Sequence, residues 1–177
     1  MRFCTGSTAI WSREIVCTEA GFGADLGAEK FVDIKCRKSG LRPDVAVVVA
    51  TVRALKYHGG VPLEDLGRED VAAVEAGMTN LRRHLTNIRD VYGIPAVVAV
   101  NRFPTDTDRE VDRVVELVAD EGVRAYPATH FADGGTGAKG LAEGVLAALA
   151  EPSPYEFSFT YDDDLSLTAK VEAIATR

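Results

Sequence analysis

Residues 96–108 read AVVAVNRFPTDTD, and this stretch decides the fold class. The run Ala96–Val100 is apolar without alternation, which is typical of a strand buried on both faces of a parallel sheet. The segment NRFPTD then ends the strand, and Thr107 followed by Glu110 has the spacing of a helix capping box. The stretch therefore predicts a buried strand, a loop and the start of a helix. The buried face of that helix is predicted at Val111, Val114, Val115 and Val118.

The same alternation of strand and helix continues on both sides of this stretch. A second apolar run covers Val45–Ala50, a weaker one covers Val123–Pro127, and a helix is predicted at Leu141–Ala150 before Pro152. Between the first two runs, apolar residues recur at intervals typical of an amphipathic helix. These residues are Val71, Val74, Met78, Leu81, Leu85 and Ile88. We therefore predict an α/β fold, a parallel sheet with helices on both faces, as a single domain over residues 1–177.

The two ends of the chain carry weaker patterns. The predicted elements are a short strand at Glu14–Thr18, a helix at Ala24–Lys38 ended by Gly40, an exposed or edge strand at Tyr155–Tyr161, and a last helix containing Leu167, Val171 and Ile174.

Composition narrows the function classes. The net charge of −7 argues against binding nucleic acid through the overall field, because neutralising phosphates requires clustered Lys and Arg. The basic-leaning stretch Lys30–Arg42 is better interpreted as a solvated helix face than as an anion site. The three cysteines form no CxxC pair and the three histidines lack metal-ligand spacing, so neither a disulfide framework nor a metal site is indicated. With no apolar run near the roughly 20 residues of a membrane span, we expect a cytoplasmic protein without a membrane partner.

Three unusual loops follow the three predicted strands: TVRALKYHGGVP, NRFPTDTD and ATHFADGGTGAKG. In open α/β sheets, ligands bind at the carboxyl ends of the strands. Phe103 and Phe131 lie in two of these loops, and a flat heteroaromatic ring could stack between them. The alternative for either residue is a hydrophobic plug folded back onto the sheet. His58, beside two glycines, suits either a mobile loop over a site or a structural loop.

NRFPTD also resembles the base-reading loop of P-loop nucleotide-binding proteins, in which Asn and Asp after a buried strand contact a purine. The sequence contains no GxxxxGK[ST] motif, so the expected core is P-loop-NTPase-like without the phosphate loop. GFGADLG, residues 21–27, does not match the dinucleotide fingerprint, because its third glycine is misplaced. Its glycines permit close backbone approach to a bound group near Phe22.

Three longer segments resemble the formate–tetrahydrofolate ligase family: TEAGFGADLGAEKFVDIKCR (18–37), RPDVAVVVATVRALKYHGG (42–60) and VNRFPTDTD (100–108). The resemblance runs from about Glu14 to the end of the chain, with 151–177 resembling the start of a truncated C-terminal segment. It implies ATP-dependent ligation of formate to tetrahydrofolate through formyl phosphate, giving 10-formyltetrahydrofolate, ADP and phosphate. Magnesium with ATP, a monovalent cation and homo-oligomers are also implied by the resemblance alone.

The resemblance also assigns residues to sites. Phe22 and Gly23 match the segment that lines the formyl phosphate site, and no residue is assigned as catalytic. Asn101, Phe103 and Pro104 match the folate and nucleotide pocket. Phe131 stands where the family often has a second stacking aromatic, tryptophan.

The departures from the family pattern set the expected activity. Family members are much longer and carry a Gly-rich phosphate loop, its Lys and an Arg that would clamp formyl phosphate, whereas the leading MRFCTGSTAIWS does not resemble the family and both ends look cut. Because phosphoryl transfer relies on positioned charge, the chain alone is expected to be inactive unless another chain supplies the phosphate loop. The alternatives are a non-catalytic folate- or nucleotide-binding module and an inactive remnant.

Overall fold

The computed structural model describes residues 2–4 and 15–176, and the chain divides into two compact units. Unit 1 comprises Met1–Ala46, His84–Pro95 and Pro152–Arg177, and unit 2 comprises Val47–Arg83 and Ala96–Glu151. The prediction of one domain over the whole chain stays a prediction.

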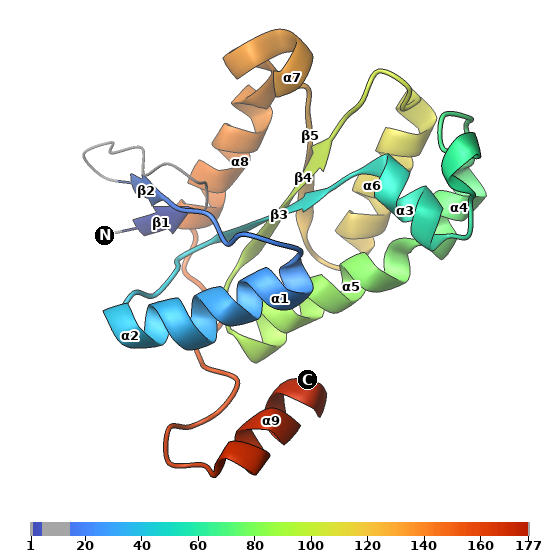
Figure 1. Ribbon diagram of the computed structural model, residues 1–177. Helices are drawn as coiled ribbons and strands as arrows, with labels where there is room; N and C mark the ends of the chain where they lie inside the picture. Colours follow the sequence, from blue (N-terminus) through green and yellow to red (C-terminus); the bar gives the residue numbers. More distant parts are fainter. Residues whose placement is uncertain (1, 5–14, 177) are drawn as a thin grey trace. The chain divides into compact units, whose positions relative to one another are not determined.

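The sheet of unit 2 has three strands in the order β3-β4-β5 (Figure 1). The strands are β3 (Ala46–Ala50), β4 (Ala96–Asn101) and β5 (Arg124–Ala128). β4 and β5 run parallel, and their pairing ends with Asn101 opposite Ala128. Four consecutive residues of β4, 97–100, are buried although successive side chains point to opposite faces, so both faces of this strand are covered. The predicted α/β class with a parallel sheet is confirmed.

Two long helices pack on this sheet. α6 (Asp108–Asp120) and α8 (Lys139–Ala150) both contact β4 and β5, and they lie on opposite sides of these strands in Figure 1. α6 begins with the predicted capping box, in which the Thr107 hydroxyl accepts the Glu110 N–H and the Glu110 carboxylate accepts the Thr107 N–H. Gly144 lets α8 approach the sheet, because a Cβ there would collide with the ring of Tyr126.

The amphipathic stretch between β3 and β4 is helical, as predicted, but interrupted at a glycine. It comprises α4 (Val71–Ala76), α5 (Met78–Thr86) and the π-helical turn η3 (Asn87–Val91), preceded by the short 3₁₀ turn η2 (Leu63–Asp65). The break falls at Gly77, where a Cβ would collide with the carbonyl oxygen of Leu55. A Cβ on Gly59 would likewise collide with the carbonyl oxygen of Ala73. These two glycines allow the helix α3 (Val52–His58), which contains Leu55, to pack against α4.

The prediction that TVRALKYHGGVP, after the first strand, forms a loop is wrong. Most of this segment is the helix α3 (Val52–His58). Thr51 caps this helix, its hydroxyl accepting the Ala54 N–H at 3.1 Å. Val52 and Leu55 lie three residues apart on one face of this helix, and their burial stabilises it. The two glycines after His58 favoured the prediction of a loop instead.

Unit 1 contains a two-stranded parallel sheet and helices from three parts of the chain. Its elements are β1 (Arg2–Cys4), β2 (Ile15–Cys17), the continuous helix α1 (Ala24–Glu29), η1 (Lys30–Cys36) and α2 (Arg37–Ser39), and the last helix α9 (Leu167–Thr176). The predicted strand near Glu14–Thr18 is confirmed as β2, with Glu14 itself outside the described residues. The predicted helix end is also confirmed, since Gly40 adopts a left-handed conformation with φ of 70°.

The strand predicted at Tyr155–Tyr161 is wrong, because none of these residues is in a strand. Its alternating aromatics instead contact cations and one another. The Arg37 guanidinium lies 4.1 Å from the ring centroid of Phe159 and donates to the carbonyl oxygen of Tyr161 at 2.7 Å. The buried carboxylate of Asp33 accepts the Thr160 N–H at 2.9 Å. Side chains of the neighbouring helix thus bind this segment, and no strand partner is needed.

Cys17 and Cys36 are free thiols, and burial raises the pKa of Cys36 to about 11, which keeps it unreactive. Across residues 2–4 and 15–176, no helix is both long enough and apolar enough to cross a membrane.

Candidate functional site

The candidate site begins where β4 and β5 end at the same edge of the sheet. Asn101 pairs with Ala128 as the last rung of the ladder, and the Arg102 N–H still donates to the Ala128 carbonyl oxygen at 3.0 Å. The segments carrying Phe103 and Phe131 therefore leave the sheet side by side. This is the arrangement predicted from the sequence.

A buried carboxylate holds the Phe103 segment. The Phe103 N–H donates to Oδ2 of Asp106 at 2.8 Å, and the Asp106 N–H donates back to the Phe103 carbonyl oxygen at 3.0 Å. Asp106 is buried, whereas Phe103 is 38% exposed and Pro104 beside it is exposed. The turn therefore presents a partly accessible ring on a fixed backbone.

Asp106 has an unusual electrostatic position. Its second carboxylate oxygen, Oδ1, is buried and accepts no hydrogen bond from any described residue. Burial raises the pKa of Asp106, and the negative charge of Glu110 acts in the same direction, against the Phe103 N–H and the cations Lys56 and Arg102. The residue that orders the loop therefore carries a carboxylate that is costly to ionise.

A fully buried ion pair joins α3 to the first turn of α6, the helix that follows this loop in the chain. Nζ of Lys56, on α3, donates to Oε1 of Glu110, on α6, at 2.8 Å, and both side chains are 0% exposed. Lys56 also donates to the Arg68 carbonyl oxygen at 2.9 Å, and Glu110 accepts the Asp70 N–H at 2.9 Å. Burial opposes ionisation of Glu110, but the hydrogen bonds from Lys56, Asp70 and Thr107 outweigh it and lower its pKa. The pair ties α3, the segment before α4 and the start of α6 together.

The Phe131 segment is built differently. Phe131 lies in the one-turn helix α7 (His130–Asp133), followed by the 3₁₀ turn η4 (Gly134–Ala138), and its side chain is 89% exposed. The Thr129 N–H donates to the Gly137 carbonyl oxygen at 3.0 Å, and a Cβ on Gly137 would lie 2.6 Å from the Thr129 carbonyl carbon. Among the described residues, no ring contact joins Phe131 to Phe103. The structure thus places the two aromatics on adjacent segments but not against each other.

Phe22 and Gly23 belong to unit 1. Phe22 has a φ of 76°, a conformation that residues other than glycine rarely adopt, and its ring is 79% exposed with Nζ of Lys30 4.5 Å from the centroid. The Gly23 carbonyl oxygen accepts the Gly27 N–H at 2.7 Å, at the start of α1. A Cβ on Gly27 would collide with the Gly21 carbonyl oxygen, so the start of α1 packs closely against the preceding turn, and the expected approach to a bound group near Phe22 stays a prediction. Strain of this kind clusters at functional sites.

The sequence pointed to Phe103 but not to the side chains that contact it or to the ion pair at the start of the helix after it. Arg53 lies in the first turn of α3, with its guanidinium carbon 5.9 Å from the ring centroid of Phe103. Lys56 and Asp106 were also missed. The capping box at Thr107 and Glu110 marked the start of α6, yet nothing in its spacing indicated that Glu110 also binds a lysine from another helix. Interpreting 51–62 as a loop hid both Arg53 and Lys56.

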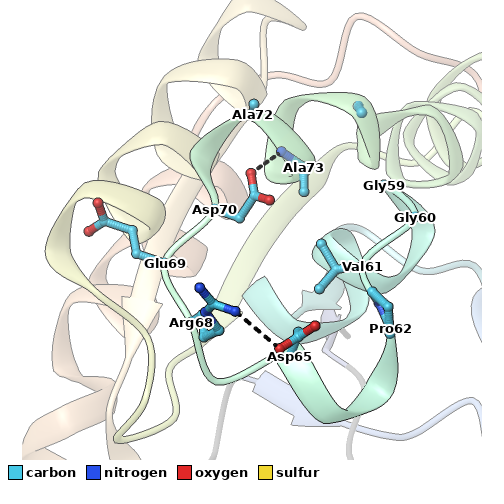
Figure 2. A pocket seen from close by; sticks show the side chains of 11 residues that line it. Gly59, Gly60, Val61, Pro62, Asp65, Arg68, Glu69, Asp70, Ala72 and Ala73 are labelled. Atoms are coloured by element: carbon cyan, nitrogen blue, oxygen red, sulfur yellow. Dashed lines mark hydrogen bonds and ion pairs between the residues drawn. The ribbon is translucent and has the colours of Figure 1, made fainter.

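A separate cavity of about 630 Å³ lies in unit 2, behind the segment between α3 and α4 (Figure 2). Its wall includes Gly59, Gly60, Arg68 and Asp70, and none of the predicted site residues lines it. In Figure 2 the Asp70 carboxylate caps α4 through the Ala73 N–H, and Arg68 pairs with Asp65 at 3.5 Å. These side chains are engaged within the wall, so we assign the cavity no ligand.

No group of three or more His, Cys, Asp or Glu residues in the described part of the chain is arranged to hold a metal ion. The GxxxxGK[ST] motif is also missing from these 177 residues, and magnesium in nucleotide sites is commonly held by one or two carboxylates together with the substrate phosphates.

Comparison with known proteins is consistent along the whole chain. The family model for formate–tetrahydrofolate ligase matches residues 3–177, so the resemblance extends further toward the N-terminus than the predicted start near Glu14. A formate–tetrahydrofolate ligase of Nocardioides sp. is 76% identical over 164 residues, which is 93% of this chain and 29% of that protein. Those of Symbiobacterium thermophilum and Methylococcus capsulatus are 54% and 52% identical, over 29% and 30% of their lengths. The chain therefore spans about three tenths of the length of these relatives.

Proposed function

Because this chain belongs to the formate–tetrahydrofolate ligase family, we propose that it contributes the ring-binding pocket for the ATP-dependent ligation of formate to tetrahydrofolate. In the proposed reaction a formate oxygen attacks the γ-phosphorus of ATP, which releases ADP and gives formyl phosphate. The N10 nitrogen of tetrahydrofolate then attacks the formyl carbon, phosphate leaves, and the nitrogen loses its proton to give 10-formyltetrahydrofolate.

The observation that carries this proposal is the Phe103 turn. Asp106 holds its backbone at both ends while the ring stays accessible at the carboxyl edge of the sheet. A preformed aromatic platform loses little conformational entropy when a flat ring stacks on it. The pterin of tetrahydrofolate and the adenine of ATP are both flat rings of suitable size. We assign Asn101, Phe103 and Pro104 to this pocket, with Phe131 as the second ring that closes over the ligand.

Phe22 and Gly23 are proposed to line the formyl phosphate site. The strained backbone at Phe22 and the turn at the start of α1 support this assignment. Lys30 beside the Phe22 ring adds a positive charge to this segment.

We further propose that the groups holding the phosphates lie outside these 177 residues, on the same polypeptide or on another chain. The sequence has no phosphate-loop motif, and the described residues contain no cluster of three or more metal-ligating side chains, so the roles proposed for the residues of this chain do not involve a metal. These residues alone should therefore bind the ring of a ligand without catalysing the reaction. A non-catalytic folate- or nucleotide-binding module is the second candidate, favoured by the same intact Phe103 turn.

The test is calorimetric titration of the folded 177-residue chain with tetrahydrofolate and, separately, with MgATP. We expect binding of at least one ligand, weakened about tenfold or more by Phe103→Ala, because stacking and ring burial are lost. Leu146→Ala, which removes an exposed apolar side chain from α8, should leave the affinity unchanged. Unchanged affinity in Phe103→Ala would show that the pocket is wrongly assigned.

A second assay separates ligase from binding module. Formate, MgATP and tetrahydrofolate are supplied to the chain, and 10-formyltetrahydrofolate is measured. Turnover by these residues alone would overturn the proposal that the phosphate-holding groups lie elsewhere. Turnover only after addition of the remaining family segment would favour the ligase over the binding module.

A further inference from the structure

Arg53 is an exposed cation beside the candidate ring platform. It lies in the first turn of α3, directly after β3, and its guanidinium carbon is 5.9 Å from the centroid of the Phe103 ring. That distance is near the limit of a cation–π contact. The edge and hydrogen-bond donors of the guanidinium therefore remain available to another group.

Arg53 differs from most other cations of unit 2 in having no anionic partner. Lysines and arginines of this unit that pair with a carboxylate are Lys56, Arg68, Arg82, Arg102, Arg109, Arg113, Arg124 and Lys139. Within residues 2–4 and 15–176, neither an ion pair nor a hydrogen bond to Arg53 is formed. Carboxylates are abundant in a chain with a net charge of −7, yet none of those in the described residues pairs with Arg53.

The chemistry of guanidinium indicates what would occupy this position. Its planar donors match the paired oxygens of a carboxylate or a phosphate, and such charge-assisted hydrogen bonds are about twice as strong as neutral ones. Both ligands proposed for the Phe103 pocket join a flat ring to an anionic group. Tetrahydrofolate carries the carboxylates of its glutamate, and ATP carries its phosphates.

We propose that Arg53 binds the anionic group of the ligand whose ring stacks on Phe103. The inference rests on the proposed function, since it takes Phe103 as the platform. Arg53 is then a specificity residue, which favours ligands that combine a ring with a negative charge over neutral rings of the same shape. The ring and the charge would be recognised by segments following two strands, β4 and β3.

The experiment compares charged and neutral ligands on two variants of the 177-residue chain. Affinities for tetrahydrofolate and ADP are measured beside those for 6-methyltetrahydropterin and adenosine, which keep each ring but lack the anionic group. We expect Arg53→Gln to weaken tetrahydrofolate or ADP about tenfold and to leave its neutral counterpart unchanged. Arg68→Gln, which removes the same charge from an 82% exposed side chain, should change none of the affinities by more than about twofold.

The outcomes show whether the anionic group bound by Arg53 is a carboxylate or a phosphate. Loss confined to tetrahydrofolate assigns Arg53 to a carboxylate, and loss confined to ADP assigns it to a phosphate. Equal weakening of the charged and the neutral ligand of a pair would overturn the proposal, because Arg53 would then act on the ring or on Phe103. Equal weakening by Arg68→Gln would also overturn it, since the effect would be one of overall charge.

Failure of this inference is distinguishable from failure of the proposed function. If Phe103→Ala weakens binding and Arg53→Gln does not, the pocket stands and the role of Arg53 is overturned. If neither variant weakens binding, both assignments fail. Absence of binding by a wild-type chain shown by circular dichroism to be folded would likewise overturn both.

Discussion

The two aromatic segments at the edge of the sheet are held in opposite ways. The Phe103 segment is fixed by the buried side chain of Asp106, and the helix α6 that follows it is joined to α3 by the buried Lys56–Glu110 pair. The Phe131 segment is held by close backbone approach at Gly137, and its ring is 89% exposed against 38% for Phe103. We propose that the Phe103 ring is a preformed platform for the ligand and that the Phe131 ring gains its contacts when a ligand binds.

The largest expected effect comes from breaking the buried ion pair at the start of α6, the helix that follows the Phe103 segment. Lys56→Met leaves the buried carboxylate of Glu110 without a cation, and should lower the free energy of unfolding by about 3–5 kcal/mol. Urea unfolding measures this change. Lys139→Met, which removes an exposed lysine paired at 3.7 Å, should cost less than about 1 kcal/mol.

The double variant Lys56→Met with Glu110→Gln sharpens this prediction. Glutamine keeps the capping box and removes the unpaired charge, so the double variant should be more stable than Lys56→Met alone. A double variant less stable than Lys56→Met would contradict the explanation that an unpaired buried charge causes the loss of stability.

The next effect concerns the other segment. Gly137→Ala places a Cβ 2.6 Å from the Thr129 carbonyl carbon, and overpacking of this kind should lower the free energy of unfolding by about 1–3 kcal/mol. Gly135→Ala is the matched control, since a Cβ there meets nothing within 4 Å. Thermal or urea unfolding of both variants checks the difference. Equal stability of the two would contradict the description of this segment as held by its backbone.

A smaller effect is expected at Asp106. Asp106→Ala removes the acceptor of the Phe103 N–H and should cost about 1 kcal/mol, whereas Asp106→Asn keeps an acceptor oxygen and should cost less. Hydrogen exchange at the Phe103 amide should quicken in the alanine variant and not in the asparagine variant. Slow exchange in both would show that another group protects this amide.

The same residue predicts a dependence on pH. Because burial raises the pKa of Asp106 above its ordinary value of 3.8, the folded state holds this proton more tightly than the unfolded state. Its contribution to the free energy of unfolding is therefore greatest below pH 3.8 and falls as pH rises toward the raised pKa. The stability of wild type relative to Asp106→Asn should decline over that window, and a difference that increases there would contradict the assignment.

The smallest effect on stability is expected at Phe131. Because the ring is almost fully exposed, Phe131→Ala should change the free energy of unfolding by less than about 0.5 kcal/mol. It should still weaken ligand binding several-fold if the ring closes over a stacked ligand, since such a contact contributes about 1 kcal/mol. Calorimetry with tetrahydrofolate beside urea unfolding makes the comparison. A large loss of stability would place Phe131 in the packing of the fold.

Much of the fold was predictable because its signals are local. The Val-rich strands, the capping box at Thr107 and the left-handed stop at Gly40 each depend on neighbouring residues in the chain. The prediction of a strand at Tyr155–Tyr161 was wrong because the conformation of this segment depends on residues far away in the sequence. Its alternating aromatics contact Arg37 and other distant cations, and the same alternation would also suit a sheet. A period of two reports which side chains point the same way, and does not report what they meet.

For the site, the sequence by itself determined the family, the strand ends and the aromatic residues, since these lie in contiguous motifs. Only the tertiary structure decided which side chains surround Phe103. Arg53 and Lys56 come from the helix after β3, while Asp106 and Glu110 follow β4, and these residues meet because the strands that precede them belong to one sheet. The pairing of a lysine with a glutamate 54 residues away is a property of that packing, since burial makes each charge depend on the other.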